Sequence, residues 1–179
     1  MNGGTVFVVG IVGITTYVAY SVSGYDPIVF DMPADQARAA IAQAVVHVPS
    51  VADRGEFSLR GGESTTDHVE LIKTTQFSPA YRENGQNRCF ARFSSISDTK
   101  VKVVADCSNE RSETSAIEAN MVEIREATFN EFIQSTLRKR AFDADSVHSK
   151  QVGAMLRNKD AMHLEALKIS DETQALQAQ

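Results

Sequence analysis

The segment Arg88–Cys107, RCFARFSSISDTKVKVVADC, decides the fold of this 179-residue chain. Apolar and polar residues alternate on both sides of Ser97-Asp98-Thr99, a pattern typical of two half-buried strands joined by a turn. The segment therefore predicts a β-hairpin, formed by Arg88–Ile96 and Lys100–Cys107.

The chain has two cysteines, and both lie at the far ends of this hairpin. A three-residue loop pairs Ile96 with Lys100, and the same register places Cys89 opposite Cys107 with the apolar side chains on one face. We expect a cross-strand disulfide, which requires an oxidising compartment. The alternative is two buried free thiols, since cysteine is often buried. Two cysteines alone are too few ligands for a structural zinc.

Two further runs with strand periodicity, Glu56–Gly61 and His68–Phe77, precede the hairpin. Their connections, Gly61–Ser64 and a segment containing Asn84-Gly85, have turn chemistry, so the four runs predict an up-and-down antiparallel sheet. A bulge near Ser78-Pro79 keeps the buried positions in phase. The expected buried face comprises Phe57, Leu59, Val69, Leu71, Phe77, Ala91, Phe93, Val101, Val103 and Ala105. The expected solvent face comprises Ser58, His68, Glu70, Arg92, Ser94, Lys102 and Asp106.

Helical patterns flank the sheet on both sides in the sequence. A short strand at Asp26–Phe30 leads to an alanine-rich helix from Ala34 to Val46 that Pro49 ends. After the sheet, Ser115 and Glu118 form a capping box that starts a long helix with a wide apolar face. We expect Ile124 and Phe132 of this helix to cover the sheet. The basic run Arg138–Arg140 fits the end of the helix, where cations complement its dipole.

The chain after residue 142 is polar and rich in glutamine towards its end. It predicts another amphipathic helix, or a helix formed on binding, and Asp171–Gln179 is expected to be disordered. The domain organisation is therefore an anchor over residues 1–25, an α+β domain over 26–142 and a polar helical or partly disordered tail over 143–179.

The N-terminal stretch Thr5–Val22 is uncharged and almost entirely apolar. Eighteen helical residues span roughly 27 Å, close to the hydrocarbon thickness of a bilayer, so we expect a single transmembrane helix. The alternative is a signal peptide cleaved before Gly24, but the basic start typical of such peptides is absent. Within the stretch, Gly10, Gly13 and Thr16 form a small-residue stripe that another membrane helix could approach.

Composition and motifs argue against several classes of function. A formal net charge of −5 disfavours nucleic acid as the main partner. The four histidines lack metal-ligand spacing, and the chain has no Gly-x-Ser-x-Gly elbow or phosphate-binding glycine loop. His47 is expected at a helix end, and paired acids such as Glu123 and Glu126 on solvated faces. We therefore predict a protein without enzymatic activity, metal or cofactor.

The segment with Phe77, Tyr81 and Arg82 combines residue types that are enriched at interaction sites. An ordinary loop with Phe77 in the core is the alternative. With the anchor and the disulfide, this surface predicts an accessory subunit of a membrane or envelope protein complex. It would be held in the inner membrane by one helix, with its soluble domain on the periplasmic side.

The order of strand, helix, antiparallel meander and long terminal helix over Asp26–Arg140 resembles a reduced helix-grip arrangement of the START and polyketide-cyclase-like domains. Those domains have more strands and an extra short helix. The resemblance implies a second possible function, in which the domain carries or senses an apolar ligand held between the sheet and the long helix. The predicted fold class is α+β: a transmembrane helix, then a four- to five-stranded antiparallel meander covered by a short helix and a long C-terminal helix.

Overall fold

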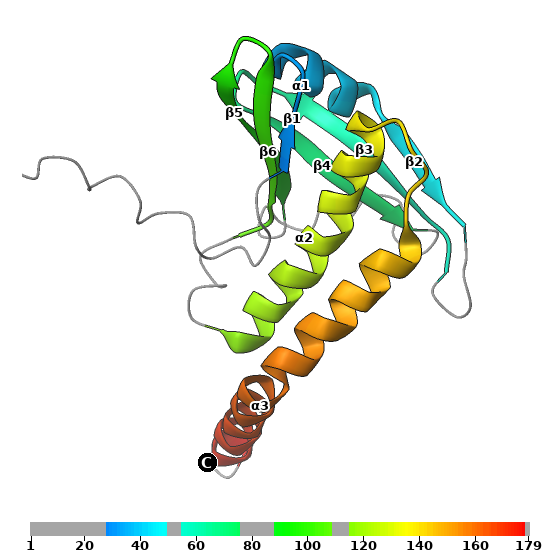
Figure 1. Ribbon diagram of the computed structural model, residues 1–179. Coiled ribbons are helices and arrows are strands. Elements are labelled where there is room, and N and C mark those ends of the chain that lie inside the picture. Colours follow the sequence, from blue (N-terminus) through cyan, green and yellow to red (C-terminus); the bar gives the residue numbers. More distant parts are fainter. Residues whose placement is uncertain (1–27, 50–54, 76–87, 109–114, 178–179) are drawn as a thin grey trace, which may run out of the picture.

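The predicted hairpin forms two neighbouring strands of a six-stranded antiparallel sheet (Figure 1). The computed structural model describes residues 28–49, 55–75, 88–108 and 115–177. Its elements are β1 (Ile28–Phe30), α1 (Ala34–Gln43), β2 (Val45–Val48), β3 (Phe57–Ser64), β4 (His68–Thr75), β5 (Cys89–Ser97), β6 (Lys100–Asp106), α2 (Ala116–Leu137) and α3 (Ala144–Gln177). The strand order is β1-β6-β5-β4-β3-β2, and the sheet curls into a half-barrel.

The α+β class and the antiparallel sheet are confirmed, but the strand number was predicted too low. The expected membrane segment and the residues Gly10, Gly13 and Thr16 lie outside the described part of the chain. Within the described ranges, no helix is both long and apolar enough to cross a membrane.

The first helix is shorter than predicted, because α1 ends at Gln43 and Val45–Val48 is a strand. Ala44 has extended backbone angles (φ −72°, ψ 139°), and its carbonyl accepts a hydrogen bond from the Gly61 N–H at 3.2 Å. A Cβ at Gly61 would collide with the backbone of Ile41, so only glycine allows the end of α1 to pack directly on β3. The β-branched side chains of β2 favour the strand that follows.

The predicted turn at Gly61–Ser64 is wrong, since these residues continue β3 through a register shift. The chain reverses instead between Ser64 and His68, where the Thr65 N–H donates to the His68 carbonyl at 2.9 Å. The second glycine, Gly62, leaves room for the side chains of Glu70 and Ile72 on β4.

The register of the hairpin is confirmed from its cysteine end up to Ser95, with Phe93 opposite Val103 and Ala91 opposite Ala105. The expected pairing of Ile96 with Lys100 is wrong. Ser97 pairs with Lys100, and a register shift between Ser95 and Ser97 leaves Ile96 outside the ladder with 56% of its surface exposed. The bulge expected near Ser78-Pro79 lies outside the described residues.

The core lies on the concave face of the sheet, against α1 and α2. Most residues of the predicted inner face are buried there: Leu59, Val69, Leu71, Ala91, Val101, Val103 and Ala105. Phe57 and Phe93 are partly buried against the same cluster. One residue predicted on the solvent face, Glu70, is instead only 5% exposed, and its carboxylate pairs with Arg88 at 3.0 Å.

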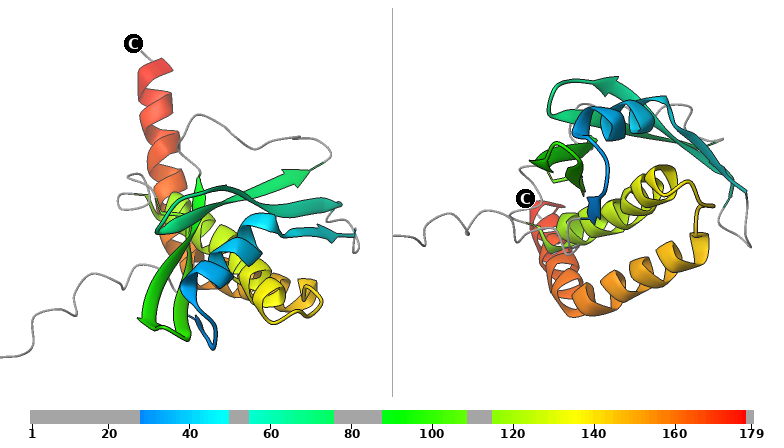
Figure 2. Two further views of the ribbon diagram at one scale, coloured as in Figure 1. Left: turned by 90° about the horizontal axis from the view of Figure 1, so that it is seen from above. Right: turned by 45° about the horizontal axis from the view of Figure 1, so that its top comes forward.

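The long helix α2 begins as predicted, with the Ser115 hydroxyl oxygen accepting a hydrogen bond from the Glu118 N–H at 3.1 Å. It lies between the sheet and α3 (Figure 2), so Phe132 is fully buried while Ile124 is half-buried. The prediction of disorder after Asp171 is wrong for residues 171–177, which belong to α3.

The connection from α2 to α3 is fixed by one buried carboxylate. Glu131 accepts two hydrogen bonds from the Arg140 guanidinium, at 2.5 and 2.8 Å, and one from the Asp143 N–H at 2.9 Å. The Asp143 side chain in turn caps α3 by accepting the Ser146 N–H at 2.8 Å. Arg140 therefore holds the helical hairpin together through this ion pair, in addition to any interaction with the helix dipole.

Candidate functional site

The Cys89–Cys107 disulfide predicted from the sequence is present, with a Cα–Cα distance of 4.1 Å. Both cysteines are buried in the core, at the end of the hairpin remote from its turn. The bond joins the second and third strands of the half-barrel where the sheet meets α2. Its presence is consistent with an oxidising compartment.

Side chains of α2 accept hydrogen bonds from the end of the hairpin beside this disulfide. The described part of β1 begins at Ile28, opposite Val103, and Ala105 and Cys107 follow Val103 along the chain. There the Ala105 N–H donates to Asn130 Oδ1 at 3.2 Å, and the Cys107 N–H donates to Glu126 Oε1 at 3.3 Å. Two helix side chains thus serve as acceptors for backbone N–H groups at this end of the hairpin.

Glu126 is a buried acid with an altered proton affinity. The residue is only 2% exposed, and its burial raises the pKa of its carboxyl to about 7. The nearby Asp106 and Glu123 carboxylates act in the same direction, while the Cys107 N–H and Arg125 oppose them. Glu126 Oε2 has no hydrogen-bond partner among the described residues, and neither has the buried Asn130 Nδ2.

The expectation that Glu123 and Glu126 share a solvated face is therefore wrong for Glu126. Glu123 pairs with Arg157 of α3, whereas Glu126 points to β6. A sequence signal existed, because Glu126 stands four residues after Val122 and three before Phe129, inside the apolar stripe of α2.

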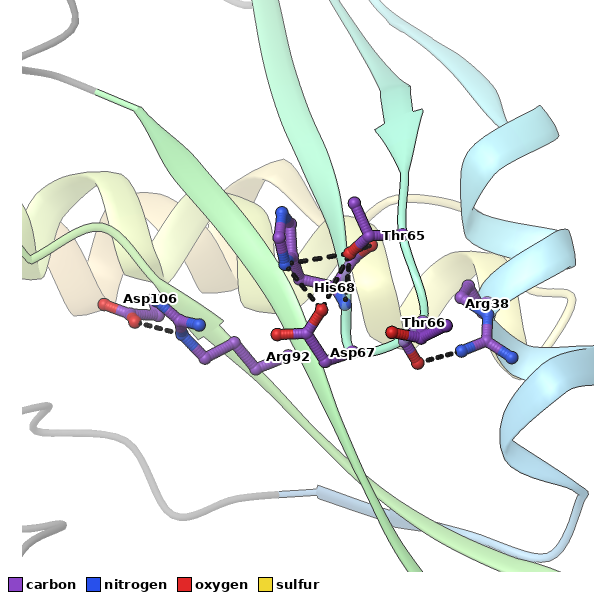
Figure 3. A network of polar contacts seen from close by, with 7 residues as sticks. All are labelled: Arg38, Thr65, Thr66, Asp67, His68, Arg92 and Asp106. Carbon is purple, nitrogen blue, oxygen red and sulfur yellow. Dashed lines mark hydrogen bonds and ion pairs between the residues drawn. The ribbon is translucent and has the colours of Figure 1, made fainter.

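A polar network covers the outer face at the start of β4 (Figure 3). Thr65 Oγ1 donates to Asp67 Oδ1 at 2.8 Å and lies 3.0 Å from His68 Nδ1, which is 3.1 Å from Asp67 Oδ1. Hydrogen bonds from Thr65 and His68 hold the pKa of Asp67 below its usual range, and the bond from Thr65 has the larger effect.

These residue types recur in hydrolytic triads, but their geometry is different. A triad uses one imidazole nitrogen for the nucleophile and the other for the acid, whereas here Thr65 and Asp67 both contact His68 Nδ1. All three residues lie within four positions of one another in the sequence. The network therefore stabilises the turn between β3 and β4.

The neighbouring strands extend this outer face with paired charges around an aromatic ring. Arg92 donates to Asp106 at 2.5 Å (Figure 3), and the guanidinium groups of Arg88 and Arg92 lie 5.2 and 5.7 Å from the Phe90 ring centroid. Partial burial would raise the pKa of Asp106, but hydrogen bonds from Ser108 and Arg92 outweigh it and lower that pKa. Both arginines have an acid partner, which suits a structural role.

His47 was predicted to lie at a helix end, and this prediction is wrong. The residue belongs to β2, and its Nδ1 lies 2.8 Å from Ser58 Oγ. Two open hollows adjoin this strand. One, of about 510 Å³, lies over β2, β3 and the end of β4. The other, of about 900 Å³, lies between β2 and the connection from α2 to α3. Between the sheet and α2 themselves, Leu71, Val103 and Phe132 are buried in one packed core.

The outer side of α3 exposes apolar side chains along most of its length. Val152, Met155, Leu156, Leu164 and Leu167 are between 39% and 67% exposed. Glu165 accepts hydrogen bonds from Ser115 and the Ile117 N–H at the start of α2, so the last turns of α3 project beyond that helix (Figure 1). Ile169 and Leu176 on this projecting part are also exposed.

The remaining residues predicted for interaction, Phe77, Tyr81 and Arg82, lie outside the described residues. In the described part of the chain, no three histidine, cysteine, aspartate or glutamate side chains are grouped so that they could hold a metal ion. Comparisons with protein-family models, with curated proteins and with solved structures gave no match for this chain.

Proposed function

We propose that this protein is a non-enzymatic, single-pass membrane-anchored accessory subunit that binds a partner protein through α3. The exposed apolar side of α3 carries this proposal. A 34-residue helix is about 51 Å long, and only Val147 and Ala154 of it are buried within the described structure. Apolar residues that line one exposed helix mark an interaction surface more often than scattered ones do.

The membrane side of the proposal is supported by the uncharged stretch Thr5–Val22 and by the disulfide. An anchor followed by a disulfide-bonded domain fits the inner membrane with the domain on the periplasmic side. The partner would then be an integral membrane protein complex. Gly10, Gly13 and Thr16 would allow close contact with one of its helices.

The test is co-purification of the full-length chain from native membranes in mild detergent. Leu156→Glu and Leu167→Glu place a charge on the exposed apolar side, and Ala161→Glu adds the same charge at another exposed position of α3. We expect the two leucine variants to lose a stoichiometric partner at least tenfold while the alanine variant keeps it. All three should melt like the wild type, because surface substitutions change stability little. Equal recovery of the partner by all three variants would contradict the use of α3.

The larger hollow supports the second candidate, a carrier or sensor of an apolar ligand. Its lining includes Val45, Val46, Val48 and Phe142, and it opens where the curled sheet approaches the helical hairpin. This position differs from the one that the helix-grip resemblance implies, because the space between the sheet and α2 is filled by the core. It ranks second because pockets for small ligands enclose most of the ligand surface, whereas this hollow is open. Saturable binding of a fluorescent fatty acid, weakened by Val46→Asp and not by Val152→Asp on α3, would favour the carrier.

A further inference from the structure

The two edges of the half-barrel are treated differently by the fold. At the β1 side, the N–H groups of Ala105 in β6 and of Cys107 just after it donate to Asn130 and Glu126 of α2. At the other side, β2 is the last strand of the sheet that the described residues form. Edge strands present unpaired backbone groups that can accept another strand.

The direction of the backbone groups of β2 follows from its pairing with β3. The Ala44 carbonyl accepts the Gly61 N–H, so it points towards β3. Because backbone directions alternate along an antiparallel strand, the N–H and C=O groups of Val45 and His47 point away from β3. No hydrogen bond between described residues uses these four groups.

The strand is short, but it lacks the charged residues, proline and bulge that protect many sheet edges. Its sequence, VVHV, contains no lysine, acid or proline, and its pairing with β3 has no bulge. Val45 is 58% exposed. The edge therefore offers two outward N–H groups and two outward carbonyls to a partner that has a backbone.

The larger hollow lies along this edge. It is bounded by Val46 and Val48 on the strand and by Phe142 on the connection between the helices. In an added strand, every second side chain would point to the same side of the sheet as Val46 and Val48. Those side chains would enter a space of about 900 Å³ with valines on the strand side and, on the other side, Phe142 between Arg140 and Asp143.

We propose that the open edge of β2 is a strand-addition site, which binds an extended polypeptide segment that has apolar side chains at alternate positions. Backbone hydrogen bonds supply the affinity in this mode and the alternate side chains supply the selectivity. The site goes beyond the proposed function, because it is separate from the outer side of α3 and stands even if α3 binds nothing.

The test uses the full-length chain in mild detergent and a short fluorescein-labelled peptide in which valine and threonine alternate between terminal lysines. Val45→Pro removes one outward N–H, and the extended angles of Ala44 already suit a following proline. Val45→Thr keeps that N–H and is the matched control. We expect fluorescence anisotropy to show saturable binding to the wild type and to Val45→Thr, and binding at least tenfold weaker to Val45→Pro.

A peptide with the same side chains but a methyl group on every backbone nitrogen should not bind, because it cannot form the ladder. Hydrogen exchange on the wild-type protein gives a second measurement that does not depend on a variant folding. Addition of the peptide should slow exchange at the Val45 and His47 amides.

Three results would each overturn the proposal. One is equal affinity of the peptide for Val45→Pro and the wild type. Another is the lack of saturable binding to the wild type at about 1 mM peptide, a concentration that detects even weak association. The third is a wild-type dimer that Val45→Pro dissociates, since the edge would then belong to a second copy of the chain.

Discussion

The buried carboxyl of Glu126 makes the stability of this protein depend on pH near neutrality. The pKa of this carboxyl is about 7 in the folded protein against an ordinary value of 4.5, so the folded state holds the proton more tightly than the unfolded state. Stability must therefore fall as the pH rises from about 4.5 to about 7. A rise in pKa from 4.5 to about 7 corresponds to about 3 kcal/mol of destabilisation above pH 7.

Glu126→Gln removes this titration while retaining an oxygen that can accept the Cys107 N–H. Relative to the wild type, the variant should gain about 2–3 kcal/mol more stability at pH 8 than it gains at pH 5. For a domain of this size, the gain corresponds to a rise in melting temperature of roughly 5–10 °C. Any pH-independent cost of the amide cancels in this comparison.

The assay is urea unfolding of the full-length chain in detergent at pH 5 and pH 8, with the disulfide intact. Glu63→Gln changes an exposed carboxyl and is the matched control. Its free energy of unfolding relative to the wild type should be the same at pH 5 and at pH 8. Asp67, Asp106 and Glu165 have pKa values below their ordinary values of 3.8, 3.8 and 4.5, so their stabilising contributions are lost as the pH falls below those values, outside this range. A stability difference between Glu126→Gln and the wild type that is equal at pH 5 and pH 8 would refute the reasoning.

Three further measurements test other parts of the structure. Replacing Cys89 and Cys107 together by serine should lower the free energy of unfolding by about 2–4 kcal/mol, and two thiols per chain in quantitative labelling of the denatured, unreduced wild type would contradict the bond. Phe132→Ala should cost about 3–5 kcal/mol by thermal or urea unfolding, and Ile124→Ala clearly less, since Phe132 is fully buried and Ile124 half-buried; equal losses would show that α2 is packed differently. The full-length chain should stay in the membrane fraction after carbonate washing, because an apolar span does not depend on electrostatics, whereas a mature N-terminus at Gly24 in mass spectrometry would show cleavage.

The sequence alone determined the features that depend on local periodicity. Alternation along Arg88–Cys107 predicted the hairpin, its register and the disulfide, because side-chain direction repeats every two residues along a strand. The capping signal at Ser115 predicted the start of α2, because the cap depends on residues only three positions apart.

Tertiary contacts decided the features that local patterns left open. Val45–Val48 continues the helical pattern in the sequence, but β3 offers a free edge and the close contact at Gly61 ends the helix first. The sequence pattern puts Glu126 in the apolar stripe of α2. The raised pKa of its carboxyl, however, depends on burial against β6 and on Asp106, which are distant in the sequence. The packing of the first part of α3 on α2 likewise joins distant segments, and no local pattern predicted which side of α3 it would cover. Periodicity is a property of neighbouring residues, whereas burial, edge pairing and proton affinity depend on which distant segments meet.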